Sequence, residues 1–225
     1  MNIEPIAHIK TDFSEKFGIP RQSGRVPEIQ GKIVFTEKYR DGAALDGIEN
    51  FSHLWLIFDF SENHRETLHP TVRPPRLGGN KRVGVFASRS PFRENFLGLS
   101  LVKFNKKVTI KGEGVVLFVE GVDLLDGTPI YDIKPYIPYC DCVPDAKGSY
   151  AEDFQDYALT VSDKNNFLGN LPSDKAEIIR KLISEDPRTA YNDDPAREWG
   201  LAYGGINVKF RVCDGIAEIS DVQKK

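Results

Sequence analysis

Residues 97–119 read LGLSLVKFNKKVTIKGEGVVLFV and predict antiparallel β-strands joined by a hairpin. β-Branched and aromatic residues recur in Leu97–Asn105, Lys107–Lys111 and Val115–Val119, and such runs favour extended backbone. Lys111-Gly112-Glu113-Gly114 separates the last two runs, where its glycines allow a tight connection. The stretch therefore favours a β-rich fold over a parallel sheet that alternates with helices.

Similar runs lie on both sides of this stretch. Further strands are predicted at Ile6–Thr11, Gly31–Glu37, Phe51–Phe60, Arg82–Ser88 and Ile130–Ile133. Gly, Pro, Asn or Asp bound these runs, as in the turn Asp126-Gly127-Thr128-Pro129. Many short strands at close spacing are typical of a barrel or a sandwich. We therefore predict a mainly β domain over residues 1–145.

The pattern changes near Gly148, beyond a polar, turn-rich segment. Asp174 as N-cap and Glu177 three residues later form a capping-box pattern at the start of a helix. The apolar face of this helix comprises Ile178, Ile179, Leu182 and Ile183, and Pro187 ends it. Two β-rich runs on either side of Asp214-Gly215 then predict a hairpin. Residues 150–225 are therefore expected to form a small α+β domain.

The composition restricts the class of protein. Its 225 residues suit one domain with an appendage, and 40% hydrophobic and 28% charged residues are ordinary for a soluble globular protein. No run of 18 apolar residues is present, and Met1–Lys10 lacks the apolar core of a signal peptide. We therefore expect a cytoplasmic protein.

The cysteines and histidines do not predict a metal site. Cys140 and Cys142 are two residues apart, but no second pair completes a four-ligand zinc site. The histidines His53, His64 and His69 lack helical metal-binding spacing. The Cys-x-Cys pair is either reactive or a pair of incidental loop thiols.

The net charge of −3 hides a local excess of positive charge. Between Thr71 and Arg93 there is no acidic residue, and the basic residues are Arg73, Arg76, Lys81, Arg82, Arg89 and Arg93. A basic patch on an acidic chain suits a partner that presents phosphates. Within the patch, prolines stiffen the Arg73–Asn80 loop and glycines permit close backbone approach. This loop is either a preorganised anion site or an exposed connection with solvated arginines.

Two further stretches place polar residues in apolar surroundings. Val85–Ser100 leaves one strand and enters another through arginines and an asparagine, which indicates either a site at strand ends or plain turn chemistry. Asp132 and Lys134 lie on the same side of an extended segment, as an ion pair or a catalytic pair. The glycine fingerprint of the usual nucleotide-binding fold is missing.

Five motifs, taken in order, resemble the TsaA-like family, whose bacterial members are tRNA threonylcarbamoyladenosine methyltransferases. They are Pro20-Arg21-Gln22, Phe51-Ser52-His53-Leu54-Trp55, the Arg73–Asn80 loop, Gly84–Ser90, and Asp126–Pro129 with Asp132–Tyr136. The match runs from Ile6 to Tyr139 and continues more weakly through Asp186–Tyr191 and Asn207-Val208. The resemblance implies a homodimer that binds S-adenosylmethionine on a single-sheeted β-barrel.

The resemblance also implies the positions of the site residues. The cofactor-binding residues would be Pro20, Arg21, Gln22, Ser61, Glu62, Arg89, Leu99, Glu120, Gly121, Val122 and Asp123. The tRNA surface is expected at Arg73, Arg76, Lys81, Arg82, Arg93 and Asn95. The family usually has Arg-Pro-Asn-Pro-Ile-Gly where this chain has Arg93-Glu94-Asn95-Phe96-Leu97-Gly98, so both prolines of that loop are replaced. Ser61-Glu62 also replaces a frequent histidine-containing pair.

The implied reaction methylates N6 of threonylcarbamoyladenosine next to the anticodon of tRNA-Thr. This nitrogen lies between a purine and a carbonyl, so it is a poor nucleophile whose proton must leave. Our hypothesis makes Asp132 the proton acceptor or orienter, Lys134 the residue that sets its charge, and Tyr136 a stacking partner for the base. The alternatives are a non-catalytic sensor of S-adenosylmethionine or RNA, and a methyltransferase for small molecules.

Overall fold

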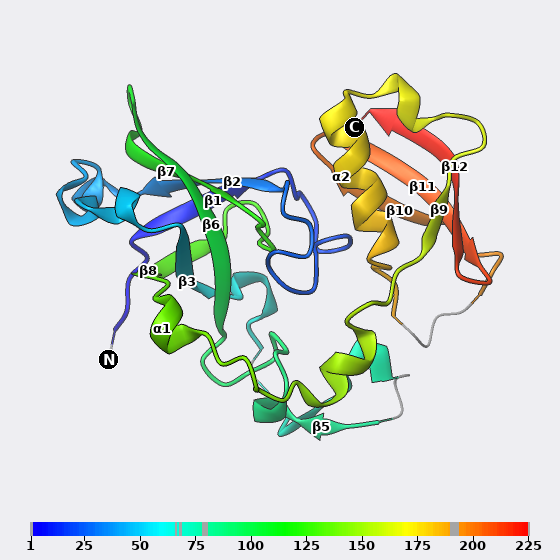
Figure 1. The fold of residues 1–225 in the computed structure, drawn as a ribbon, viewed down its shortest axis with the longest axis horizontal. Coiled ribbons are helices and arrows are strands. Elements are labelled where there is room, and N and C mark those ends of the chain that lie inside the picture. The colour runs from blue at the N-terminus through cyan, green and yellow to red at the C-terminus, as the bar shows by residue number, and fades with distance from the viewer. Residues whose placement is uncertain (1, 66, 68, 78–80, 190–193, 225) are drawn as a thin grey trace.

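The computed structural model describes residues 2–65, 67, 69–77, 81–189 and 194–224. Figure 1 shows an N-terminal group of strands and, beside it, a C-terminal sheet with one longer helix. Strands dominate both parts, so the mainly β prediction is confirmed. None of the helices in the described part of the chain is long and apolar enough to cross a membrane.

Six N-terminal strands pair in the closed order β1-β2-β7-β6-β3-β8. Their bounds are β1 Ala7–Thr11, β2 Gln30–Phe35, β3 His53–Asp59, β6 Leu97–Ile110, β7 Gly114–Glu120 and β8 Pro129–Pro135. All neighbours are antiparallel, and β8 returns to β1 through the pairs Ala7↔Ile130 and His8↔Pro129. Leu54 and Leu56 of β3 are fully buried inside the ring of strands, whereas the alternate residues point outward.

Residues 97–119 form the predicted hairpin with one difference. The structure joins the two predicted runs before Lys111 into the single strand β6 of 14 residues. Its pairing with β7 shifts register between Phe104 and Lys106, so a β-bulge inside one strand lies next to the break predicted at Lys106. Gly112 and Gly114 have φ of 90° and 80°, the left-handed region that glycine enters without strain.

The strand predicted at Arg82–Ser88 is mostly wrong. Only β5 Val83–Gly84 is extended, paired with β4 Thr71–Val72, and the 3-10 turn η6 Val85–Ala87 follows. Arg73-Pro74-Pro75 directly follows β4, and proline has no N–H with which to extend the ladder. The other short turns are η1 Glu37–Tyr39, η2 Ala43–Leu45, η3 Ile48–Asn50, η4 Ser61–Asn63, η5 Pro75–Leu77, η7 Ser149–Phe154 and η8 Leu168–Asn170, with one short helix α1 Pro138–Asp141.

The C-terminal part is a four-stranded sheet with helix α2, Ser173–Ser184, packed on it. Its strands run in the order β10 Trp199–Tyr203, β11 Ile206–Cys213, β12 Ile216–Lys224 and β9 Thr160–Ser162, so the predicted hairpin is confirmed. The apolar face of α2 is buried as expected. The predicted N-cap is wrong, because Pro172 precedes the helix and Asp174 lies inside its first turn without capping it.

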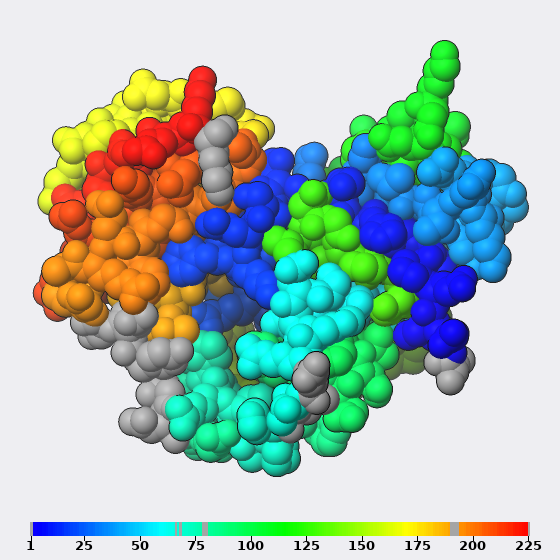
Figure 2. Space-filling view, turned by 180° about the vertical axis from the view of Figure 1, so that it is seen from behind, coloured from blue at the N-terminus to red at the C-terminus, as the bar shows by residue number. Residues whose placement is uncertain are grey.

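The C-terminal part packs against the loop between β1 and β2. The Phe17 ring stacks on Trp199 with centroids 5.6 Å apart, and Phe13 meets Tyr203 edge-on at 5.1 Å. A side chain on Gly18 would overlap Leu201, so glycine is required at this contact. Figure 2 shows the blue segment that follows β1 directly against the orange C-terminal strands. The two parts therefore share one continuous apolar core.

Candidate cofactor cavity and basic groove

A cavity of about 450 Å³ lies between the β1–β2 loop, the end of β3, the loop after η6 and the start of β6. The Phe58 ring and Gly98 form part of its wall, and a Cβ on Gly98 would overlap that ring. Glycine at this position therefore sets the shape of the cavity. Its aromatic neighbours Phe60 and Trp55 add further apolar wall.

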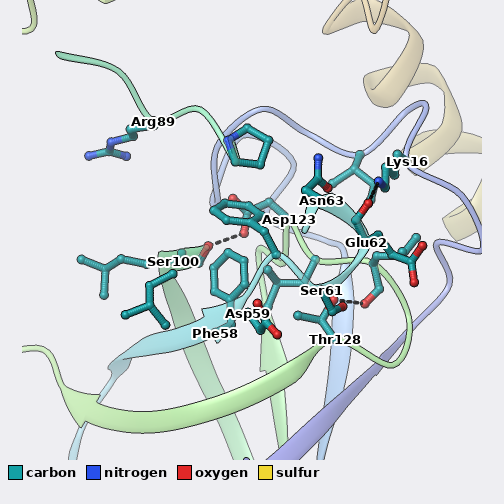
Figure 3. A pocket seen from close by; sticks show the side chains of 18 of the residues that line it. Lys16, Phe58, Asp59, Ser61, Glu62, Asn63, Arg89, Ser100, Asp123 and Thr128 are labelled. Carbon is teal, nitrogen blue, oxygen red and sulfur yellow. Dashed lines mark hydrogen bonds between the residues drawn. The ribbon is translucent and has the colours of Figure 1, made fainter. Parts of the chain in front are cut away.

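Most residues that the sequence assigned to the cofactor line this cavity. They are Pro20, Arg21, Gln22, Ser61, Glu62, Arg89, Leu99 and Asp123. In Figure 3, Arg89 lies at one end of the cavity and Lys16 at the other. The Arg89 guanidinium donates to the Gln22 amide oxygen, and Lys16 Nζ donates to the Glu62 carbonyl at 2.6 Å. The fold thus collects residues from distant parts of the chain around one space.

Glu120, Gly121 and Val122 do not line the cavity, and their contact with the cofactor stays a prediction. The Glu120 carboxylate accepts from Lys103 Nζ at 2.9 Å, on the outside of the barrel. Gly121 has φ 73° and donates its N–H to the Ile29 carbonyl, and Val122 is buried in the core. These contacts fix the turn that leads to Asp123.

Asp123 is the acidic residue most strongly affected by its surroundings. Burial raises the pKa of its carboxyl to about 6, against the opposing effects of hydrogen bonds and of the nearby Arg89 charge. Ser100 Oγ donates to Asp123 Oδ1 at 2.6 Å. The protonation state of this carboxyl therefore changes close to neutral pH.

The wall also contains residues that were not predicted from the sequence, among them Lys16, Asn63 and Asp59. Asp59 is 7% exposed, accepts from Tyr131 Oη at 3.1 Å, and lies 2.7 Å from His64 Nε2. A register shift against β8 at Ile57/Phe58 lets two consecutive residues, Phe58 and Asp59, be buried. The polar run at the end of a predicted strand was the signal available for finding them.

A larger groove of about 1400 Å³ adjoins the cavity. It lies between the β4–β5 hairpin, the segment that follows β5, and η7. Among the described residues that line it, seven are arginines and two are acidic: Arg21, Arg25, Arg65, Arg73, Arg76, Arg82 and Arg89 against Glu152 and Glu185. Phe86 on the groove wall is 82% exposed, and Arg65 stacks over the Phe92 ring at 4.1 Å. Positive charge interleaved with exposed aromatic rings is typical of single-stranded nucleic-acid sites.

The residues predicted to contact tRNA fall into different environments. Arg73 and Arg82 line the groove and are exposed, and Arg82 Nε donates to Thr71 Oγ1 at 2.8 Å. Lys81 and Asn95 are exposed but line neither space. Arg93 lines the cavity instead, and its NH1 donates to the carbonyls of Ser88 and Ser90. Gly78, Gly79 and Asn80 of the predicted anion loop lie outside the described residues.

Arg76 is engaged within the protein. Its guanidinium stacks over the Tyr157 ring at 4.2 Å, donates to the Glu185 carbonyl at 2.7 Å and lies 3.5 Å from the Asp186 carboxylate. Its side chain is only 14% exposed. The charge and donors of Arg76 therefore tie the groove to the C-terminal part, and its contact with a tRNA phosphate stays a prediction.

The three predicted catalytic residues lie outside the cavity. Asp132 and Lys134 form an ion pair of 3.3 Å on β8, with about half or more of each side chain exposed. Tyr136 follows the strand, and its ring lies 6.0 Å from that of Trp55, which does line the cavity. Within one chain, this cluster is next to the cavity but does not reach into it.

The cavity and the groove share a wall made of Arg21, Gln22, Ser88, Arg89 and Pro91. A small molecule in the cavity and a larger one in the groove would therefore meet across these residues. Fold and site together define a β-barrel protein whose charged small-molecule cavity opens into a basic, aromatic groove.

Two family models match the chain, the tRNA-methyltransferase O N-terminal domain over residues 8–142 and the TrmO C-terminal domain over residues 154–225. The chain belongs to this family, which confirms the resemblance found in its motifs. The tRNA (adenine(37)-N6)-methyltransferase of Escherichia coli K12 is 39% identical over 96% of this chain and 95% of its own length. A relative from Pseudomonas aeruginosa that is named as an S-adenosylmethionine-dependent methyltransferase is 36% identical over 93% of this chain and 91% of its own length. The crystal structure of TrmO from P. aeruginosa superposes with a TM-score of 0.78 and 30% identity, covering 100% of this chain and 97% of that one.

Proposed function

We propose that this protein transfers a methyl group from S-adenosylmethionine to N6 of threonylcarbamoyladenosine, beside the anticodon of tRNA-Thr. Relatives named tRNA (adenine(37)-N6)-methyltransferases support the reaction class. The observation that carries the proposal is the wall shared by the cavity and the basic groove, because methyl transfer requires donor and acceptor to meet.

The residues of the cavity suit S-adenosylmethionine, which supplies a methyl group on a sulfonium. The cavity volume of about 450 Å³ lies within the roughly 300–1,000 Å³ usual for small-molecule sites. The cofactor carries charges of both signs, and the wall offers the acids Asp59, Glu62 and Asp123 together with the cations Lys16 and Arg89. Pro20, Gln22, Ser61 and Leu99 would complete its surroundings, with the aromatic rings beside the adenine.

The groove suits the anticodon loop of a tRNA. Arg73 and Arg82, with the neighbouring Lys81, would contact phosphates, and the exposed Phe86 ring offers a surface on which an unpaired base can stack. Single-stranded loops present such bases, whereas a paired stem does not. In this assignment Arg93 and Asn95 lie beyond the groove, and Arg93 supports the loop that leads back to the cavity.

We also propose a homodimer in which a second copy covers the outer face of β3 and β6. Trp55, Ile57, Leu99 and Leu101 point outward there, and Leu99 is 56% exposed although it lines the cavity. An outward apolar face of this kind is typical of an interface. Asp132, Lys134 and Tyr136 border this face, so a second copy would bring them to the acceptor. Asp132 would then take or orient the N6 proton.

The proposed domains are residues 1–145, a barrel that binds S-adenosylmethionine, and residues 150–225, a small α+β domain that borders the groove. The pairing of all six barrel strands before Tyr136 supports the first, and the separate sheet of β9 to β12 supports the second. We propose that the enzyme acts in the cytoplasm, where its tRNA substrate is found.

The test is transfer of labelled methyl from S-adenosylmethionine to bulk tRNA from cells that lack the protein. We expect incorporation into the modified adenosine next to the anticodon, and no incorporation into tRNA that lacks the threonylcarbamoyl group. Cofactor binding without transfer to tRNA would instead identify a sensor. Methyl transfer confined to small molecules would identify a different methyltransferase on the same fold.

A further inference from the structure

Arg21 lies on the wall between the cavity and the groove, and the C-terminal part of the chain holds its side chain in place. Its NH2 donates to the carbonyl oxygens of Asp186 and Arg188, at 3.2 and 2.5 Å. Asp186 has a positive φ of 49° and is buried, and its carboxylate accepts from Arg188 Nε at 2.8 Å and from Tyr157 Oη at 2.9 Å. This network presets the direction of the Arg21 guanidinium.

Among the residues that the structure describes, the positive charge of Arg21 has no direct counter-ion. None of the salt bridges between described residues includes Arg21, although its neighbours Arg25 and Arg76 pair with Glu185 and Asp186. Its Nε is buried and has no hydrogen-bond partner among the described residues. Burial, and then the nearby charge of Arg76, lower the pKa of Arg21, yet an arginine in a protein keeps its proton. A half-buried cation with no carboxylate partner among the described residues is suited to an anionic group.

The chemistry of the reaction identifies a candidate anion. In threonylcarbamoyladenosine the N6 nitrogen carries, through a carbonyl, a threonine whose carboxylate is only a few bonds away. When N6 faces the cofactor across the shared wall, this carboxylate must lie near the same wall. A guanidinium binds a carboxylate through parallel charge-assisted hydrogen bonds, the strongest of the ordinary kinds.

We propose that Arg21 binds the threonyl carboxylate of the substrate base and thereby selects threonylcarbamoyladenosine over unmodified adenosine. The inference rests on the proposed function and adds to it the residue that reads the modification. It also gives the C-terminal part a role in specificity, since the carbonyl groups of Asp186 and Arg188 hold the reader in place. The carboxylate of S-adenosylmethionine offers the same chemistry, so the test must separate the two sources.

The experiment compares two anticodon stem-loop RNAs that differ only at the threonyl group. One carries the natural carboxylate, and the other carries the neutral carboxamide. We expect the protein to prefer the carboxylate by about 10- to 100-fold in kcat/KM, the range for a hydrogen bond to a charged group. Equal rates with both RNAs would overturn the inference without any variant. Absence of methylation on both RNAs and on native tRNA would mean that the proposed function itself fails.

The Arg21→Gln variant then locates the preference. Glutamine keeps an N–H donor for the carbonyl oxygens but loses the charge, so the preference, measured with saturating S-adenosylmethionine, should fall to near unity. The matched control is Arg25→Gln. Arg25 is a neighbouring arginine that pairs with Glu185 and lines the groove but not the cavity. The control should keep the full preference.

Two outcomes would overturn the assignment. One is a folded Arg21→Gln protein that keeps the wild-type preference. The other is a loss of cofactor affinity with the preference intact, which would mean that Arg21 binds the carboxylate of the cofactor. Should Arg21→Gln fail to fold, Arg21→Lys keeps the charge but loses the planar fork, and the preference should still drop by several-fold. An unchanged preference in Arg21→Lys would count against the inference.

Discussion

Asp132 and Leu99 lie in one cross-strand row on the outer face of the barrel, with Ile57 between them. Neighbouring strands are about 4.8 Å apart, so the two backbones are separated by about 10 Å. Leu99 lines the cavity and Asp132 does not. The proposed proton acceptor therefore faces the same side as the cavity, at a distance that a second copy of the chain would have to bridge.

This relationship gives a prediction for Asp132→Asn. We expect turnover to fall by about 100-fold or more, in the range for loss of an acid–base group, with cofactor affinity unchanged. Stability should change by less than about 1 kcal/mol, because an exposed ion pair contributes little. Single-turnover methylation with saturating cofactor measures the first effect, and calorimetry and thermal melting measure the others.

The control and the contrary result are both accessible. Glu218 forms a similarly exposed ion pair with Lys164, away from the cavity. The control variant Glu218→Gln should therefore leave turnover, cofactor affinity and stability unchanged. Mixing Asp132→Asn subunits with Arg89→Ala subunits should restore part of the activity if the carboxylate acts across a homodimer. A normal rate for Asp132→Asn would assign the Asp132–Lys134 pair to the surface alone.

Local pattern predicted much of the barrel, because the alternation in Leu54 and Leu56 and the glycines near Lys111 act over a few residues. Family motifs grouped Gln22 and Arg89, and the two residues line the same cavity although they are 67 positions apart. The pairing of Arg76 with Asp186 was not predictable in this way. Those residues are 110 positions apart, and an arginine in a Pro-rich loop has the same local sequence whether solvent or a buried carboxylate receives it.

Cofactor affinity should depend on Arg89. Its guanidinium donates to Gln22 and lies near Asp123 at one end of the cavity. We expect Arg89→Ala to weaken binding of S-adenosylmethionine about 10-fold or more, as removal of a charge-assisted hydrogen bond predicts. Calorimetry measures the change. Arg82 lines only the groove, so the Arg82→Ala control should bind the cofactor normally. Wild-type affinity in a folded Arg89→Ala variant would remove Arg89 from the site.

Binding of tRNA should be electrostatic and centred on the exposed arginines of the groove. The double variant Arg73→Ala and Arg82→Ala should reduce the log–log salt slope of tRNA affinity by roughly 0.7–0.9 for each phosphate that the protein no longer neutralises. Arg76→Ala should behave differently, because its guanidinium is held by the C-terminal part. We expect that variant to lower the melting temperature more than the slope. An unaltered slope in the double variant would place the tRNA on another face.

The raised pKa of Asp123 predicts how stability depends on pH. A carboxyl whose pKa is about 6 in the folded state, against an ordinary value of 3.8, binds its proton more tightly when folded. The resulting stabilisation is therefore complete below about pH 4 and is lost as pH rises through about 6, with a total of about 3 kcal/mol. Chemical denaturation of the free protein between pH 4 and pH 7.5 measures this loss, and Asp123→Asn should remove most of it.

Protonation of Asp123 should have the opposite effect on cofactor affinity, which we expect to rise with pH. The ionised carboxylate attracts the positive charges of S-adenosylmethionine, so affinity should rise between pH 5 and pH 7.5 as Asp123 loses its proton. In Asp123→Asn the amide preserves the shape without the charge, and the affinity should be low and nearly independent of pH. Ser100→Ala provides the matched comparison, because it removes the hydrogen bond to Asp123 Oδ1 and should shift the rise in affinity to higher pH. A pH profile that is the same in wild type and Asp123→Asn would show that another group, and not this carboxylate, governs cofactor binding.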